Sequence, residues 1–70
     1  MPEMQPVVSS NVAAIGYDET TEDVYVEFIE SGMYAYERVP LPVWQDFEVA
    51  SSKGGFVNSV LKPNYACRRP

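Results

Sequence analysis

The sequence contains no histidine and a single cysteine, Cys67, among its 70 residues. An intrachain disulfide is therefore excluded, and one thiol without any imidazole cannot form a zinc site. Nucleophilic catalysis by this thiol is disfavoured as well, because no histidine is present to act as its base. A chain without disulfides suits a reducing, cytoplasmic setting. We expect no metal, no cofactor and no enzymatic activity.

Long apolar runs are also missing. No stretch approaches the roughly 20 residues that a membrane-spanning helix needs. The first residues, Met1-Pro2-Glu3-Met4-Gln5-Pro6, lack the basic and apolar regions of a signal peptide, so we expect no membrane contact. Hydrophobic residues nevertheless make up 46% of the chain, which favours a folded protein. Its length allows a single domain with a thin core.

Basic residues are few, and they are unevenly placed. Residues 1–50 contain all ten acidic residues and one cation, Arg38, whereas residues 51–70 contain four cations and no acid. The net charge of −5 disfavours general coating of DNA, which requires many phosphate contacts. The distribution predicts a local basic edge near the C-terminus.

Hydrophobic periodicity predicts an α+β fold. Alternation indicates a three-stranded antiparallel meander over residues 11–17, 23–29 and 33–39, preceded by an irregular segment over residues 1–8. The clearest alternation places Val24, Val26 and Phe28 on one face of the second strand. Gly32 follows Glu30 and Ser31 in a tight hairpin turn, where a glycine readily adopts positive φ.

Two short helices are expected to pack on one face of this sheet. The first begins at Pro40 or Pro42 and ends near Ala50, and the second spans residues 53–62, where Pro63 stops it. A short extended tail follows. We expect the core to be formed by Val26, Phe28, Trp44 and Phe47.

Several short motifs follow one another in this order: Ser9-Ser10-Asn11, Ile15-Gly16-Tyr17-Asp18, Val24-x-Val26-x-Phe28, Gly32-x-Tyr34-x-Tyr36, Val39-Pro40, Ala50-Ser51-Ser52-Lys53-Gly54, Phe56-x-Asn58 and Tyr65. Together they resemble the KTSC domain over about residues 7–69. That family is named for its occurrence at the C-terminus of some lysyl-tRNA synthetases, and it also occurs as a stand-alone small protein in bacteria and phages. The resemblance implies a single domain over residues 9–70. Attachment to a synthetase suggests RNA binding, by association alone.

The third predicted strand carries two tyrosines, Tyr34 and Tyr36, which point to the same face because they are two residues apart. The rings can seal the core under the helices. Alternatively, they can form an exposed platform that stacks on bases or on side chains of a partner. The sequence leaves both interpretations open and favours packing in the core.

Two further clusters have a functional and a structural interpretation. The segment Ser52-Lys53-Gly54-Gly55 lies at a helix start, where free N–H groups and a lysine can hold an anion, although a turn capped by serine is the better interpretation. The acidic residues of the 18–23 turn fit a solvated turn better than a cation site.

The C-terminal tyrosine, Tyr65, lies among the cations Lys62, Arg68 and Arg69, an arrangement that suits RNA or an acidic protein surface. We predict a small non-catalytic module that binds a protein partner, because the chain is acidic overall. RNA binding through the Tyr-x-Tyr strand and the basic C-terminal edge is the alternative, and no small-molecule substrate is expected. The predicted contact surface comprises Tyr34, Tyr36, Lys53, Tyr65, Arg68 and Arg69.

Overall fold

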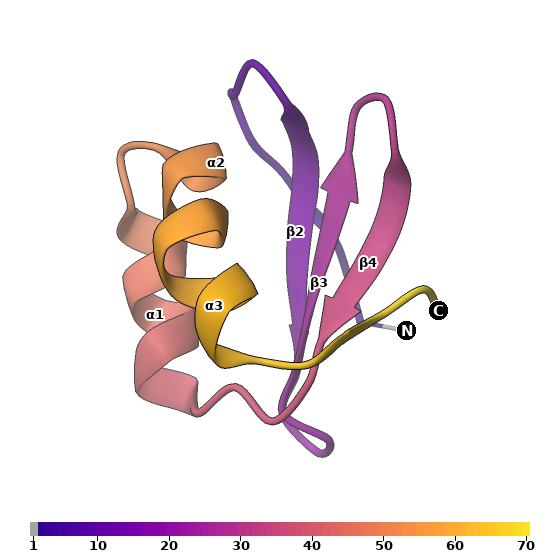
Figure 1. Cartoon of the computed structure of the whole chain (residues 1–70), viewed down its shortest axis with the longest axis vertical. Coiled ribbons are helices and arrows are strands. Elements are labelled where there is room, and N and C mark those ends of the chain that lie inside the picture. Colours follow the sequence, from indigo (N-terminus) through magenta and orange to yellow (C-terminus); the bar gives the residue numbers. More distant parts are fainter. Residues whose placement is uncertain (1) are drawn as a thin grey trace.

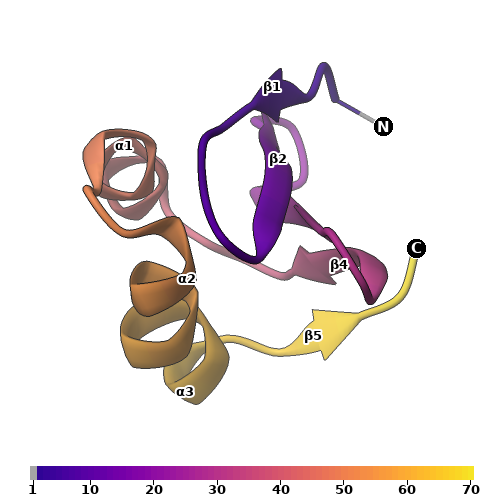
Figure 2. The ribbon, with the colours of Figure 1, turned by 90° about the horizontal axis from the view of Figure 1, so that it is seen from above.

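The computed structural model describes residues 2–70. Over these residues the chain folds into an antiparallel sheet that is covered on one side by helices (Figure 1). The C-terminus lies on the side of the sheet away from the helices (Figure 2). The elements in chain order are β1 (Gln5–Pro6), β2 (Val12–Asp18), β3 (Asp23–Phe28), β4 (Gly32–Tyr36), α1 (Leu41–Val49), α2 (Lys53–Phe56), the π-helical turn η1 (Val57–Leu61), α3 (Lys62–Asn64) and β5 (Cys67–Arg68).

The sheet has five strands within residues 2–70, in the order β1-β2-β3-β4-β5, with every neighbouring pair antiparallel. The α+β class and the antiparallel meander are confirmed, since the predicted strands correspond to β2, β3 and β4. The number of three strands is wrong, because a two-residue strand adds to each edge. Strands this short have no periodicity that a sequence pattern could reveal.

The N-terminal edge strand, β1, lies in the segment predicted to be irregular. Gln5 lies opposite Ile15 of β2, and the chain before it passes over Gly16. A Cβ atom at Gly16 would lie 2.7 Å from the sulfur of Met4 and 2.9 Å from the carbonyl oxygen of Glu3. The missing side chain therefore allows residues 3–4 to lie directly on the face of the sheet opposite the helices.

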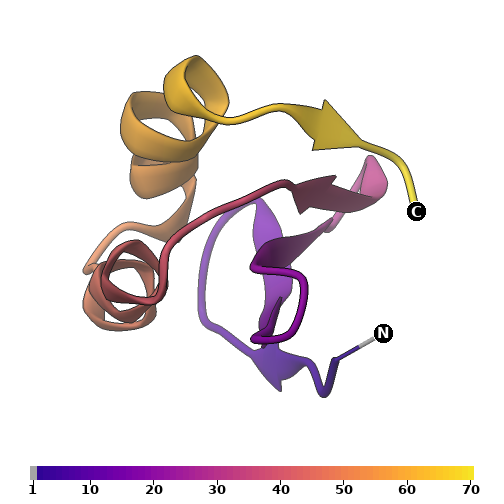
Figure 3. The same cartoon turned by 90° about the horizontal axis from the view of Figure 1, so that it is seen from below.

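The C-terminal edge strand, β5, lies in the predicted extended tail. Cys67 lies opposite Tyr36, and Arg68 lies opposite Ala35 of β4. Figure 3 shows how the chain leaves α3 and runs back along β4 to reach this position. The tail is thus part of the sheet, which fixes the position of the basic C-terminal residues.

The third predicted strand ends earlier than expected. β4 stops at Tyr36, and Arg38 has a φ of 58°, which interrupts the extended backbone. Val39 is nevertheless fully buried, and its N–H donates to the carbonyl oxygen of Glu22 at 2.7 Å. The predicted positive φ of Gly32 in the β3–β4 hairpin is confirmed at 86°.

The first helix begins as predicted. Pro40 precedes α1 in an extended conformation and Pro42 occupies its first turn, where the missing N–H has no partner to lose. Ala50 lies just beyond the helix, with φ −63° and ψ 134°.

The second helix continues beyond its predicted end at Pro63. Residues 53–64 form a succession of α2, η1 and α3, and in η1 the N–H of Lys62 donates to the carbonyl of Val57, five residues earlier. Proline offers no N–H to the carbonyl of Ser59, and its ring crowds a regular α-turn. The wider π-turn accommodates the proline, so that it does not end the helix at this point.

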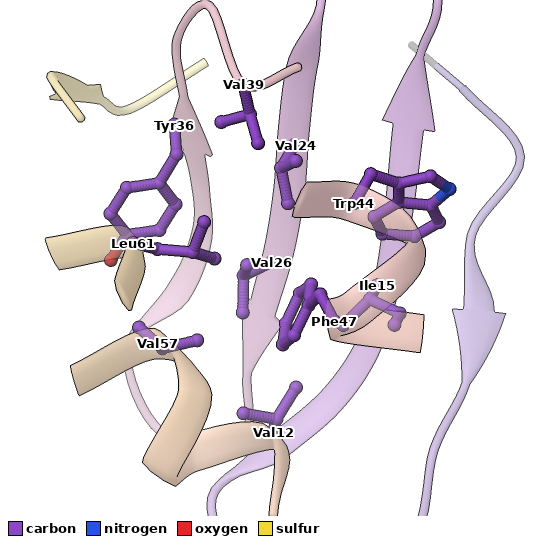
Figure 4. Close-up of a cluster of buried hydrophobic side chains, with 10 residues drawn as sticks. All are labelled: Val12, Ile15, Val24, Val26, Tyr36, Val39, Trp44, Phe47, Val57 and Leu61. Atoms are coloured by element: carbon purple, nitrogen blue, oxygen red, sulfur yellow. The ribbon is translucent and has the colours of Figure 1, made fainter. Parts of the chain in front are cut away.

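The core lies between the helices and the face of the sheet that carries Val26 and Tyr36 (Figure 4). Of the four predicted core residues, Val26, Trp44 and Phe47 are buried and Phe28 is partly buried against them. The opposite face of the sheet is also covered in part, as the 7% exposure of Tyr25 on that face shows.

Within residues 2–70, each helix is too short, or not apolar enough, to cross a membrane.

Candidate functional site

The two tyrosines of β4 point to the same face, as predicted, but they differ in exposure. In the sheet register Tyr34 lies opposite Val26 and Tyr36 lies opposite Val24, so both rings face the helices. Tyr36 is buried, at 3% exposure, whereas Tyr34 is half-buried at the edge of the core. The pair therefore offers one accessible ring and one ring that belongs largely to the core.

The accessible ring of Tyr34 is held on two sides. It packs against the ring of Phe28 in a T-shaped arrangement with ring centroids 5.5 Å apart. The guanidinium carbon of Arg69 lies 4.6 Å from the Tyr34 ring centroid, and the group donates to the phenol oxygen at 2.8 Å and to the carbonyl oxygen of Ser31 at 3.0 Å. Tyr34 and Arg69 thus form a joint surface with a fixed orientation.

Arg68, adjacent in the chain, is engaged on the opposite face. It donates to the carboxylate of Asp23 at 3.0 Å and to that of Glu37 at 2.9 Å. The hydrogen bond to Asp23 and then that to Glu37 raise the pKa of Arg68 above its ordinary value. The side chain of Asp23 is only 9% exposed, so this cation links β5 to β3 across the intervening strand β4.

Lys53 turns back to the first helix. Its ammonium group donates to the carbonyl oxygen of Ala50 at 2.6 Å and to that of Glu48 at 3.1 Å, where it satisfies groups at the C-terminus of α1. Ser52 accepts from the N–H of Gly55 at 3.0 Å and caps α2. These contacts match the structural interpretation of this segment, a capped turn between helices.

Tyr65 is partly buried and packs against the core. It lines a separate, open hollow with Glu37, Arg38 and Asn64. The six residues predicted as one contact surface are therefore divided. Only Tyr34, Tyr36 and Arg69 lie close together, and Cys67 is an exposed free thiol near them on β5.

The acidic turn before β3 is organised by local hydrogen bonds. Asp18 accepts from the side chain of Thr20 at 2.6 Å and from its N–H at 2.9 Å. These bonds hold the pKa of the Asp18 carboxyl below its ordinary value. Among the residues that the structure describes, no group of three or more acidic or thiol side chains is placed to hold a metal ion.

A cleft of about 280 Å³ lies between the β3–β4 turn and η1, and it brings together side chains that are far apart in the sequence. Phe28 and Val57 provide apolar walls, and both tyrosines of β4 reach it. Its remaining lining is polar and consists of Asn11, Ser31, Asn58 and Lys62.

The π-turn and a glycine together shape this cleft. Val57, Asn58 and Lys62 all belong to η1 or its immediate end, and such turns often occur at functional sites. On the other side, a Cβ atom at Gly54 would lie 2.5 Å from the amide oxygen of Asn11. Glycine at this position thus allows Asn11 to pack against the start of α2 at the border of the cleft.

The hydroxyl of Tyr36 stays protonated at neutral pH. Burial, with Cys67 and Tyr34 as lesser causes, raises the pKa of Tyr36 to about 12. The group therefore remains a neutral hydrogen-bond donor and acceptor beside the cleft.

Sequence reasoning missed Asn11, Ser31 and Asn58 as site residues. Asn11 and Asn58 stand in the short motifs described above, and Lys62 was noted only as a cation near Tyr65. Nothing in the local sequence indicates that these residues meet, because the hairpin, the β1–β2 connection and η1 are brought together only by the fold.

Comparisons with known proteins agree with this architecture. A family model described as the KTSC domain matches residues 8–65. A protein of Tsukamurella paurometabola is 40% identical over 62 residues, which cover 89% of this chain and 92% of the relative. A lysine–tRNA ligase of Nostoc is 32% identical over 56 residues, which cover 80% of this chain and 10% of the ligase. The crystal structure of a KTSC domain protein from Yersinia pestis is similar with a TM-score of 0.94 and 38% identity, covering 100% of this chain and 99% of that one.

Proposed function

This chain belongs to the KTSC domain family, as its motif order implied, and we propose that it is a small non-catalytic module that docks on a protein partner. The contact surface consists of the cleft beside η1 and the Tyr34–Arg69 pair at its rim. We further propose that it acts in the cytoplasm, where its single cysteine stays reduced.

The observation that carries this proposal is the fixed Tyr34–Arg69 pair next to a cleft. Tyrosine and arginine are the residue types that most often dominate the energy of a protein interface. Both side chains are already held by Phe28 and Ser31, so little conformational entropy is lost when a partner binds. A prearranged aromatic anchor of this kind suits a protein surface.

RNA binding is supported less well. Of the cations expected to form a basic edge, Arg68 is bound to two carboxylates and Lys53 to helix carbonyls, while Arg69 lies over Tyr34. A nucleic-acid surface needs several lysines or arginines directed at phosphates. Similarity to a short part of a lysine–tRNA ligase keeps RNA as an outcome that the experiment must be able to detect.

The test is affinity capture from native cells with tagged chain, read out by mass spectrometry and by RNA sequencing. Wild type is compared with Tyr34→Ala and with Val49→Ala, the latter an 83% exposed apolar residue on α1. We expect a protein that wild type and Val49→Ala recover and Tyr34→Ala loses. With that protein purified, Tyr34→Ala should weaken binding about thirtyfold, a loss typical of an interface anchor.

Three results would count against the proposal. Recovery of RNA that Tyr34→Ala loses, without a protein, would indicate the alternative. Loss of the partner with Val49→Ala instead of Tyr34→Ala would place the contact on α1. Equal recovery with all variants, each shown to be folded by circular dichroism, would remove this surface from the binding site.

A further inference from the structure

Hydrogen-bond donors converge on the cleft. Arginine can only donate, so its bond to the Tyr34 oxygen leaves the Tyr34 hydroxyl proton to be donated elsewhere. The hydroxyl of Ser9 donates to the amide oxygen of Asn11 at 3.2 Å, which leaves the Asn11 NH₂ group as a donor. Lys62 adds a positive charge to the lining, and Asn58 adds a further amide group.

Negative charge is absent from this lining, although the chain as a whole is strongly acidic. Among the residues described around the cleft, none is Asp or Glu, whereas the whole chain has ten. Arg69 adds a second positive charge at the rim, where it binds Ser31 and Tyr34. An adjoining hollow contains one acidic residue, Glu30, which shares that hollow with Asn11 and Ser31. The cleft is therefore a local positive, donor-rich site on an acidic protein.

The size and walls of the cleft restrict its occupant. A volume of about 280 Å³ lies at the lower limit of the range of about 300–1,000 Å³ that is usual for ligand pockets, which favours a small group. Phe28 and Val57 provide apolar walls suited to methylene groups, while the donors require an acceptor. A single side chain with an apolar stem and an anionic end meets both requirements.

We infer that this cleft binds the carboxylate of a Glu side chain presented by a peptide of the protein partner. The inference rests on the proposed function and names the group that the contact surface recognises. Lys62, Asn11, Asn58 and the Tyr34 hydroxyl supply the hydrogen bonds, and Arg69 holds Tyr34 in position. Phosphates of RNA are the competing anion, but two cations are too few to bind a polyanion tightly.

The test is a two-dimensional NMR titration of the isotope-labelled chain with short blocked peptides. Acetyl-Ala-Glu-Ala-amide presents a side-chain carboxylate, acetyl-Ala-Gln-Ala-amide is its neutral match, and acetyl-Ala-Gln-Ala with a free C-terminus presents a terminal carboxylate. A hexauridylate and inorganic phosphate complete the set. We expect the glutamate peptide to shift the amides of Ser31, Asn58 and Lys62 at about millimolar concentration, and the free-terminus peptide to bind more weakly. The neutral peptide should bind about tenfold more weakly.

Variants separate a specific site from general charge effects. Lys62→Gln should weaken carboxylate binding about tenfold, because it removes a charge-assisted hydrogen bond. Arg38→Gln removes the same charge from an exposed residue at the separate hollow near Tyr65, and it should change the affinity less than about twofold. Asn58→Ala is a second, exposed change that should weaken binding while the amide spectrum shows a folded chain.

Equal binding of the glutamate and glutamine peptides, or equal effects of Lys62→Gln and Arg38→Gln, would overturn the inference. If hexauridylate bound more tightly than the glutamate peptide and shifted the same amides, RNA and not a carboxylate would be the ligand of the cleft. No shift with any peptide at about 10 mM would show that the cleft does not recognise carboxylates. If the inference fails while Tyr34→Ala still abolishes capture of the partner protein, the proposed function stands. If both fail, the surface has another role.

Discussion

The helix layer has two halves that are built differently. Under α1, Trp44 stacks on Tyr17 with ring centroids 5.3 Å apart, and Phe47 stacks on Phe56 at 5.0 Å. Under η1, the buried side chains are the smaller Val57 and Leu61, which lie beside Tyr36 on the other side of the core (Figure 4). The cleft borders the η1 half, and Val57 forms part of its wall.

This difference separates stability from binding. Large aromatic rings fill the space under α1, and Phe47 among them is fully buried. Aliphatic side chains and a widened turn leave space under η1, where polar groups can line a cleft. Changes in the α1 half should therefore affect unfolding, and changes in the η1 half should affect recognition.

Phe47→Ala should have the largest effect. Phe47 is fully buried in the α1 half, and loss of its ring leaves a cavity that should cost about 3–5 kcal/mol of the free energy of unfolding. Urea denaturation measures this loss, and so small a domain should be largely unfolded by it. Val49→Ala, on the exposed side of the same helix, should stay within about 0.5 kcal/mol. Similar stability of both variants would mean that α1 is not the stabilising half.

The buried tyrosine of the η1 half should make stability depend on alkaline pH. The folded pKa of Tyr36, about 12, exceeds the ordinary value of 10.0, so folding favours the neutral phenol. This contribution is complete below pH 10 and is lost as the pH rises through 12. Wild type should thus lose about 2 kcal/mol more than Tyr36→Phe between about pH 9 and pH 11.5 in urea denaturation. Parallel loss in both proteins would show that Tyr36 ionises as freely in the folded chain as in the unfolded one.

The ion pair on the opposite face tests whether Arg68 belongs to the scaffold or to the binding surface. Asp23→Asn should cost about 1–2 kcal/mol, because it removes the charge from a nearly buried carboxylate that binds Arg68. Glu37→Gln changes a partner that is 39% exposed and should cost less than about 0.5 kcal/mol. Thermal unfolding compares the two. If folded Asp23→Asn lost peptide binding, Arg68 would belong to the binding surface and not to the scaffold.

Pro63→Ala should have the smallest effect on stability and the opposite sign. Alanine supplies the missing N–H and a better helix former, so the free energy of unfolding should rise by up to about 1 kcal/mol. The π-turn should then tighten toward a regular α-helix, and the affinity of the cleft for the glutamate peptide should fall. Hydrogen exchange of the new backbone N–H at position 63 and the peptide titration measure both effects. Unchanged η1 hydrogen bonding in this variant would mean that proline does not cause the π-turn.

The sequence predicted those parts of the fold that depend on local pattern. Alternation at Val24, Val26 and Phe28 identified β3, and the prolines before Trp44 identified the start of α1. The edge strands were not predicted, because two residues are too few to show a hydrophobic period. The helix was predicted to end at Pro63, because hydrophobic spacing does not reveal a π-turn. The cleft escaped for a different reason. Asn11 and Asn58 are far apart in the sequence, and only packing of η1 against the hairpin brings them to one place.

The two edge strands bear on how a partner can approach. Each is two residues long, β1 contains Pro6, and Pro70 lies shortly after β5. These short edge strands present few backbone N–H and C=O groups to which a strand from another molecule could bind, and a proline has no backbone N–H to donate. Strand addition, a common way for small domains to bind extended peptides, is thereby disfavoured at both edges. The same blunted edges protect the domain against aggregation through its own sheet, and they leave side chains as its means of selecting a partner.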